Sequence, residues 1–386
     1  MEKPSQEALD HAAELYDLLQ ERGFDLEQLR EREVGKVALW QMGMKNAEHE
    51  FESHDLYGIE LRSEYDEDKE PFSPATPAKI TPTSRRGVKR DHKVYLAFGD
   101  EQIDYRRIED DVLDPLHDEA ALNVLTQINR DLMPEELVGL GDGNDFANLS
   151  KFASDSDHFH RTMGPAFQRK HDLWAQLKAD NPNSKRKEMD SNHVKRLGQW
   201  VLQNMPQMYN MRRPGQDSEY PIMSYPYLAN FDHLGVEWVS GYGAAEYIIN
   251  EELGPQALSF RHGTEHSSAS TTAAAKALKN RPDINTIQGH DHRESRAFRT
   301  DRFGRYIGAL VVGALARTTG EVPGYHSAVD DNGNVVHSQQ NWQQGLLVIR
   351  DYGGGNYEFQ NVPIKDGLAY YNGKEYNGNE RTIRNF

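Results

Sequence analysis

The sequence contains no cysteine, and this absence excludes several kinds of chemistry. Without cysteine there is no disulfide framework, no thiolate zinc site, no iron–sulfur cluster and no cysteine nucleophile. Any bound metal must therefore be held by His, Asp, Glu, Asn or Gln side chains.

The sequence also lacks a long apolar run. The longest such run, Ile307 to Ala316, is far shorter than the roughly 18 residues that a membrane-spanning helix needs. The N-terminal residues MEKPSQEALD do not show the basic segment and apolar stretch of a secretory signal. These features predict a soluble, cytoplasmic protein without a membrane partner.

Positive charge is scarce as well. The chain has 44 basic and 61 acidic residues, a formal net charge of −17, which argues against a broad basic surface that coats nucleic acid. Only local basic patches remain as candidates for contact with nucleic-acid phosphates. One patch lies in SRRGVKRDHK, with the candidate substrate-binding residues Arg85, Arg86, Lys89 and Arg90, and a second lies over 185–195. The ordinary interpretation of such a patch is a solvated run of charge.

The distribution of residue types divides the chain into three parts. Residues 1–63 predict a small α+β module, with an amphipathic helix over 5–22 and strands over 37–46 and 54–63. Residues 64–93 are acidic and proline-rich and then basic, which predicts a flexible linker. Residues 94–386 form the main domain.

The main domain shows the pattern of an α/β fold. Short apolar segments alternate with helical stretches such as 118–131 and 192–207, and the four segments are VYLAF, ELVGLG, ALSF and INTIQG. From Tyr325 onward, Gly- and Asn-containing turns separate strand-like pieces such as GLLVIRD and YEFQNVPI. These pieces predict antiparallel strands that close the sheet.

Polar residues that could bind a metal follow these apolar segments. Ligands gather at the carboxyl ends of strands in α/β folds. The residues at these positions are Gly99-Asp100-Glu101-Gln102, Gly141-Asp142-Gly143-Asn144-Asp145, Arg261-His262-Gly263 and Gly289-His290-Asp291-His292, with Ser191-Asn192-His193 at the start of a helix.

Each of these signals has an ordinary structural interpretation when it is taken alone. A Gly-Asp after a strand is usually turn chemistry, and Asn192 could simply cap its helix. His290 and His292 alternate in an extended segment, so both rings could reach one metal, or they could be a pair of structural histidines. The ordered set, rather than any single member, predicts a site for two metals.

The motifs in this order resemble those of the calcineurin-like metallophosphoesterases. The resemblance runs from about Val94 to Arg293. A narrower resemblance, to actinobacteriophage phosphoesterases described as Mre11-like nucleases, rests on LHDEAALNVLTQINRDL, GLGDGND and NWQQGLLVIRDYGGG. The family implies a four-layer αββα sandwich, to which the small N-terminal module would be added.

The resemblance also implies the role of each site residue. It implies that Asp100, Gln102 and His292 hold one metal, that Asn192, His262 and His290 hold the other, and that Asp142 bridges both. His193 would be the catalytic histidine that binds no metal. Asp145 would brace its loop.

Three residues depart from the family pattern. Gln102 stands where the family usually has His, so an amide oxygen replaces an imidazole nitrogen and a harder ion, Mn²⁺, is expected over Zn²⁺ or Fe. Ser191 replaces a glycine. Val194 replaces an acid, which removes a carboxylate that could orient nearby groups.

The function that the resemblance implies is phosphodiester hydrolysis by a metal-bridging hydroxide, with nucleic acid, DNA before RNA, as the substrate. One alternative is a phosphodiesterase or phosphatase for small substrates such as cyclic nucleotides, which the negative charge favours mildly. A remote alternative is a non-catalytic binding protein with a degenerate site, motivated by Gln102 and Val194. The sequence does not indicate an oligomeric state.

Overall fold

The chain divides into two compact units, Met1–Pro71 and Phe72–Phe386. The computed structural model describes residues 33–45, 51–62, 74–82, 90–108, 112–149, 161–215, 218–267, 272–318, 328–329, 335–336 and 341–380. In the first unit these residues form an antiparallel hairpin of β1 (Glu33–Lys45) and β2 (Phe51–Arg62). The two strands expected there are present, and the helix expected over 5–22 lies outside the described residues.

Part of the predicted flexible linker is anchored to the second unit. The backbone N–H of Ala75 donates to the Leu228 carbonyl at 2.7 Å, and that of Ala78 lies 3.0 Å from His171 Nε2. Both alanine side chains are buried. The composition did not reveal this anchoring because it depends on partners that lie far away in the sequence.

The second unit contains a mixed sheet of eight strands. Its parallel half consists of β3 (Lys93–Phe98), β6 (Glu136–Gly139), β7 (Lys185–Met189) and β8 (Glu237–Val239). Its antiparallel half consists of β16 (Gln344–Asp351), β17 (Tyr357–Lys365), β18 (Leu368–Tyr371) and β19 (Lys374–Asn377). Because β16 pairs with β3, the C-terminal strands close the sheet as predicted.

A second sheet has five strands in the order β12-β13-β11-β10-β9. The strands β10 (Leu258–Arg261), β11 (Asn285–Gln288) and β13 (Tyr306–Val311) are parallel. The edge strands β12 (Ser295–Thr300) and β9 (Tyr247–Ile249) are antiparallel to their neighbours.

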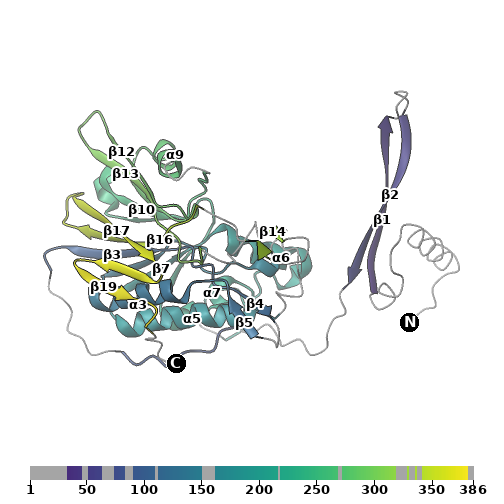
Figure 1. Cartoon of the computed structure of the whole chain (residues 1–386), viewed down its shortest axis with the longest axis horizontal. Helices are drawn as coiled ribbons and strands as arrows, with labels where there is room; N and C mark the ends of the chain where they lie inside the picture. Colours follow the sequence, from purple (N-terminus) through teal and green to yellow (C-terminus); the bar gives the residue numbers. More distant parts are fainter. Residues whose placement is uncertain are drawn as a thin grey trace. The chain divides into compact units, whose positions relative to one another are not determined.

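Helices cover the outer faces of the two sheets, which gives four layers in the order αββα (Figure 1). On the large sheet lie α3 (Glu119–Leu132), α5 (Met163–Asp180), α6 (Asn192–Asn204), α7 (Tyr225–Leu228) and α8 (Phe231–Leu234). On the small sheet lies α9 (Thr272–Asn280), whose Ala273 and Ala274 pack on Val311. The predicted sandwich is thereby confirmed.

Strand β3 shows why the sandwich has two cores. Val94, Leu96 and Phe98 belong to the core beneath the helices, and Tyr95 and Ala97 belong to the core between the sheets. Successive side chains of a strand point to opposite faces. A continuous apolar run such as VYLAF therefore fills both cores.

Shorter elements connect these layers. They are β4 (Tyr105–Ile108) with β5 (Val112–Pro115), β14 (Ala328–Val329) with β15 (Val335–Val336), and the 3₁₀ turns η2 (Ala147–Leu149), η3 (Pro206–Met208) and η4 (Glu251–Gln256). Among the described residues, no helix is long and apolar enough to cross a membrane.

Candidate metal centre

All seven predicted metal ligands lie on loops that leave the carboxyl ends of strands. Asp100 and Gln102 follow β3, Asp142 follows β6, and Asn192 begins α6 just after β7. In the second sheet, His262 follows β10, and His290 and His292 follow β11. Because the strands that carry these loops are parallel within each sheet, the loops leave the same edge of the sheet, and the distances below show that the two sets of loops meet.

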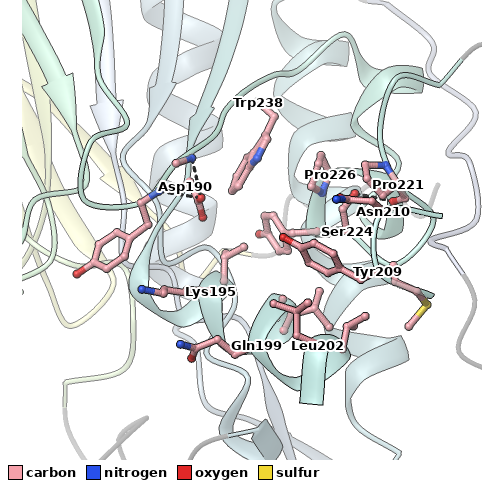
Figure 2. Close-up of a pocket in the computed structure, with 18 residues that line it drawn as sticks. Asp190, Lys195, Gln199, Leu202, Tyr209, Asn210, Pro221, Ser224, Pro226 and Trp238 are labelled. Carbon is pink, nitrogen blue, oxygen red and sulfur yellow. Dashed lines mark hydrogen bonds between the residues drawn. The ribbon is translucent and has the colours of Figure 1, made fainter. Parts of the chain in front are cut away.

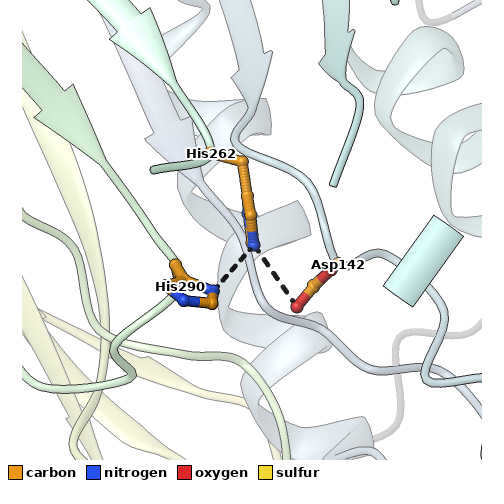
Figure 3. Close-up of side chains that lie close together, drawn as sticks. All are labelled: Asp142, His262 and His290. Carbon is orange, nitrogen blue, oxygen red and sulfur yellow. Dashed lines mark hydrogen bonds and ion pairs between the residues drawn. The ribbon is translucent and has the colours of Figure 1, made fainter. Parts of the chain in front are cut away.

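The first group of ligand atoms gathers around His262 (Figure 3). His262 Nε2 lies 2.7 Å from Asn192 Oδ1, 3.2 Å from His290 Nδ1 and 3.4 Å from Asp142 Oδ2. One ligand atom each from Asp142, His262 and His290 lies within 4.8 Å of the others. The structure therefore brings together the four residues that the family resemblance assigns to one metal.

Hydrogen bonds select which ring atoms of this group would bind a metal. His262 Nδ1 lies 2.9 Å from the Leu140 carbonyl, so Nδ1 carries a proton and Nε2 is the atom that would bind a metal in place of its own proton. Burial is the larger cause, and repulsion between the charged forms of His262 and His290 is the smaller cause, of a pKa of His290 that is lowered to about 4. His290 is therefore neutral at pH 7, as a metal ligand must be.

The second group shares Asp142 with the first. Asp100, Asp142 and His292 each offer an atom within 4.8 Å of the others. His292 Nε2 lies 3.3 Å from Asp100 Oδ1 and 3.0 Å from Gln102 Nε2. Rotation of the Gln102 amide by half a turn would direct its oxygen to the same place.

Two atoms of this group are poorly satisfied by the protein alone. Asp100 Oδ1 and Gln102 Oε1 are buried, and neither has a hydrogen-bond partner within the described part of the chain. Buried polar atoms are normally hydrogen-bonded because an unsatisfied one is costly. A cation bound between Asp100 Oδ1, His292 Nε2 and the Gln102 oxygen in its rotated position would satisfy both oxygens, so the donor set fits a metal.

The backbone at the site is strained. Asp100, Gln102, Asp142, His290 and His292 have φ angles of 53°, 46°, 52°, 74° and 56°. Residues other than glycine seldom adopt this left-handed region, and each instance costs about 1–3 kcal/mol. Five of the seven predicted ligands are in this conformation, which turns their side chains toward the shared centre.

A glycine allows the closest approach between the two sheets' loops. A Cβ at position 289 would lie 2.5 Å from Asp100 Oδ2, a separation that a side chain cannot adopt. Because Gly289 has no Cβ, Asp100 Oδ2 can accept a hydrogen bond from the backbone N–H of His290, at 2.9 Å. Gly289 thus lets the first sheet's loop fix the second sheet's loop.

The carboxylate of Asp142 attracts positive charge. Burial alone would raise its pKa, but His193 and His262 hold that pKa well below its usual range. In turn, Asp142 outweighs the effect of burial on His262 and raises the pKa of His262 to about 9. An ionised carboxylate at the centre of the cluster also favours a bound cation.

His193 lies beside this cluster, and its ring is oriented by Asp145, which lies on the same loop as Asp142. Its Nδ1 lies 3.0 Å from the Asp145 carbonyl and 2.8 Å from the Asp145 carboxylate, and its Nε2 lies 3.6 Å from Asp142 Oδ2. Because both neighbours of Nδ1 are acceptors, Nδ1 carries a proton and Nε2 faces the site. Asp145 thus orients His193, in addition to the bracing role expected for it.

Arg196 is a functional candidate that the motif search missed. Its guanidinium donates to the Asp145 carbonyl at 2.8 Å and lies 3.2 Å from His193 Nε2. The spacing could have revealed it, because residues three apart on a helix share a face and Arg196 is three residues after His193.

A buried charge network supports the ligand loops and was also missed. Lys170 Nζ lies 2.7 Å from Glu101 Oε1 and 3.1 Å from Glu188 Oε2, and all three side chains are fully buried. Glu101 stands between two predicted ligands. A Cβ on Gly143 would lie 2.4 Å from Lys170 Nζ, so the Asp142 loop rests on this lysine.

Burial raises the pKa of Glu188 to about 7, with Lys170 opposing the rise and Glu101 adding to it. The positive charge of Lys170 therefore offsets the negative charge of little more than one of the two carboxylates. The available signal was a lysine within the apolar stripe of a helix, since Lys170 alternates with Phe167 and Trp174 at helical spacing.

Of the four predicted substrate-binding residues, the structure describes Arg90. Arg85, Arg86 and Lys89 lie outside the described residues. Arg90 donates to the carbonyls of Leu132 and Met133 at the end of α3, beside the amino end of β3. Because a strand of this length spans about 20 Å, Arg90 is far from Asp100, and its expected role in substrate binding is not supported.

The basic residues of the second patch, over 185–195, lie in two separate places. Arg186 donates to the Leu234 carbonyl at 3.2 Å near the amino ends of β7 and β8, and Lys187 pairs with Glu237. Lys195, on α6, lies one helical turn from Asn192 and is the member of the patch that lies near the ligand cluster.

Three solved structures have a distant likeness to this chain. A purple acid phosphatase from yellow lupin (Lupinus luteus) seeds aligns over 88% of this chain and 59% of its own, with 11% identity and a TM-score of 0.35. A 5'-nucleotidase precursor from Thermus thermophilus aligns over 70% of this chain and 54% of its own, with 9% identity and a TM-score of 0.29. TT1561 of the same organism aligns over 70% of this chain and 99% of its own, with 10% identity and a TM-score of 0.24.

This chain thus spans less than two thirds of the first two structures. No protein-family model matches the sequence, and no curated protein matches it. At such low TM-scores the likenesses say little about chemistry, and the geometry of the site carries the functional proposal.

Proposed function

We propose that this protein is a dinuclear metal-dependent phosphodiester hydrolase. The observation that carries the proposal is the position of Asp142, which belongs to both groups of ligand atoms. A carboxylate shared by two groups of nitrogen and oxygen donors is suited to hold two divalent ions side by side. The retained donors also disfavour a degenerate site that only binds.

Each proposed ion has its own residues in addition to Asp142. Asp100, Gln102 and His292 would hold one ion, and Asn192, His262 and His290 would hold the other. Bound there, two divalent ions would withdraw electron density from a phosphoryl group and lower the pKa of a bound water into the neutral range. The buried ligand loops keep these donors in place without the substrate.

His193 has the position of a proton donor. Asp145 holds the ring through Nδ1, so Nε2 faces the cluster and could deliver a proton to the oxygen that leaves the phosphorus. The guanidinium of Arg196 adds a fixed positive charge beside Nε2. Together these side chains would stabilise negative charge that develops on the departing oxygen.

We propose Mn²⁺ as the physiological ion. The second group, with Asp100, Gln102, Asp142 and His292, contains one imidazole, one amide and two carboxylates, a mainly oxygen donor set that suits Mn²⁺ better than it suits a softer ion. Activity with Mn²⁺ should therefore exceed activity with Zn²⁺ at equal occupancy.

We propose nucleic acid, with DNA favoured, as the substrate. The support is the family resemblance, together with Lys195 and Arg196 on the helix that begins at Asn192. Small phosphodiesters such as cyclic nucleotides are the second candidate. They are favoured by the net charge of −17 and by the engagement of Arg90 and Arg186 with backbone carbonyls at the opposite end of the sheet.

An activity panel tests the proposal. The metal-loaded protein is assayed with single-stranded DNA, duplex DNA, RNA, a cyclic nucleotide, bis(p-nitrophenyl) phosphate and p-nitrophenyl phosphate. We expect diester hydrolysis that EDTA abolishes and Mn²⁺ restores. Hydrolysis of the monoester alone, or of no substrate with any divalent ion, would contradict a phosphodiesterase.

A further inference from the structure

A pocket of about 420 Å³ opens along α6, the helix that begins at the ligand Asn192. This volume lies within the range of about 300–1,000 Å³ that is typical of small-molecule sites. Val194 and Lys195 line it, and they follow His193 directly in the sequence. The pocket therefore starts within about one helical turn of the proposed metal ligands.

Two further contacts connect the pocket to the metal centre. Tyr242 lines the pocket, and its ring centroid lies 5.9 Å from that of His262. The Asp190 carboxylate accepts the backbone N–H groups of Gly241 and Tyr242, both at 2.9 Å. Asp190 thus fixes the loop of Gly241 and Tyr242 beside the pocket (Figure 2).

The walls of the pocket are flat and apolar. Tyr209 and Trp238 line it, and Tyr225 forms a buried floor whose ring centroid lies 5.3 Å from that of Trp238. The Tyr225 hydroxyl donates to Asn144 Oδ1 at 2.9 Å, on the same loop as Asp142. Tyr209 keeps 45% of its surface exposed, so a planar group could stack on it.

Polar groups stand at the rim. Gln199 and Asn210 both line the pocket and are exposed, one on either side of Tyr209 (Figure 2). Their amides offer both donors and acceptors, as the edge of a nucleobase does. The Lys195 ammonium lies 6.0 Å from the Tyr242 ring, at the side where the pocket approaches the metal ligands.

We propose that this pocket binds a nucleobase of the substrate, the one adjacent to the phosphodiester that is cleaved. The aromatic walls would stack on the base, the rim amides would meet its edge, and Lys195 would contact a phosphate oxygen between the pocket and the metals. This inference rests on the proposed function, since it assigns the substrate class of the same site. Val194, which stands where the family has an acid, gives the pocket an apolar wall beside His193.

Two substrates that share the p-nitrophenyl phosphodiester, one with a nucleoside and one with a methyl group in its place, test the inference. They are the p-nitrophenyl diesters of thymidine 5'-phosphate and of methyl phosphate, assayed with wild type, Tyr209→Ala and Tyr209→Phe. We expect Tyr209→Ala to raise KM for the thymidine diester roughly tenfold, the scale of one lost base stack, and to leave the methyl diester within about twofold. Tyr209→Phe should stay close to wild type because it keeps the ring.

Tyr370→Ala is the matched control. Tyr370 is an exposed tyrosine on β18, 65% accessible, and it does not line the pocket. We expect no change with either substrate. An equal change of KM for both diesters in Tyr209→Ala, or no change for either, would overturn the inference even though hydrolysis is observed.

A binding measurement separates this inference from the proposed function. Calorimetric titration of the metal-loaded protein compares thymidine 5'-phosphate with deoxyribose 5-phosphate, which lacks the base. We expect the nucleotide to bind roughly tenfold more tightly, and Tyr209→Ala to abolish the difference. If no diester is hydrolysed but this preference is found, the pocket assignment stands and the proposed reaction fails. Equal binding of both compounds would overturn the pocket assignment.

Discussion

In the parallel half of the large sheet, the strands begin along one side, here called the amino edge, and end along the other, the carboxyl edge. The two edges use polar and charged residues in opposite ways. At the amino edge, Arg90 and Arg186 donate to the backbone carbonyls that end α3 and α8. At the carboxyl edge, Asp100 and Gln102 are buried, adopt positive φ angles and keep side-chain oxygens without hydrogen bonds. Of these four residues, only Asp100 and Gln102, at the carboxyl edge, have buried side-chain oxygens that no other group in the described part of the chain satisfies.

This difference teaches how a functional edge can be recognised. Charge that is paired with helix ends stabilises the fold, so the charge itself does not indicate a ligand. Strain and unsatisfied buried atoms cost stability, and they persist where they are retained for function. The following changes test this contrast, from the largest expected effect to the smallest.

Replacement of Asp142 should have the largest effect on activity. Asp142→Ala removes the one side chain common to both ligand groups, so we expect turnover of a p-nitrophenyl diester to fall by at least about a thousandfold. Steady-state kinetics measures the loss. The control is Asp301→Asn, which changes an aspartate paired with Arg305 in the turn at the amino end of β13 and should retain wild-type turnover.

Replacement of Lys170 should have the largest effect on stability. Lys170→Met leaves Glu101 and Glu188 buried without their cation, and breaking such a pair costs about 3–5 kcal/mol. Urea unfolding checks this value. Lys178→Met, on the same helix but partly exposed, should cost less than about 1 kcal/mol. Equal losses in the two variants would show that the buried network does not support the ligand loops.

Replacement of His193 should separate metal binding from chemistry. His193→Ala should keep both metals and lose roughly a hundredfold in turnover, the scale of a missing proton donor. The loss should shrink for leaving groups of low pKa, because p-nitrophenolate needs no proton to depart. Loss of metal from this variant would instead identify His193 as a ligand.

Replacement of Arg90 should have the smallest effect. Arg90→Gln weakens hydrogen bonds to the end of α3 and should cost about 1 kcal/mol of stability, without a change in kcat/KM for DNA or for a small diester. Thermal unfolding and steady-state assays measure the two quantities. If hydrolysis of DNA alone fell tenfold, the amino edge would take part in substrate binding after all.

The sequence indicated which candidate residues gather at the carboxyl edge, because these residues directly follow apolar strands; their assignment as metal ligands comes from the family resemblance and stays a prediction. Parallel strands deliver their carboxyl ends to one edge, so Asp100, Asp142 and His262 could be grouped before their distances were known. The continuous apolar run VYLAF is likewise typical of a strand that is buried on both faces.

Other features depend on contacts between residues that lie far apart in the sequence. The partners of Lys170 come from β7 and from the loop after β3, and those of Arg90 come from the end of α3. From the sequence alone, a run of basic residues is interpreted as a surface patch, because the distant residues that pair with it are not known. The positive φ angle of Gln102 could not be predicted either, because glutamine seldom adopts that conformation.

Metal stoichiometry is the most direct test of the central claim. Elemental analysis of Mn²⁺-loaded protein should give two ions per chain for wild type. The same analysis should show that Asp142→Ala loses both ions more readily than Asp100→Ala, because Asp142 alone belongs to both groups. A stoichiometry near one ion per chain that Asp142→Ala leaves unchanged would contradict the dinuclear centre.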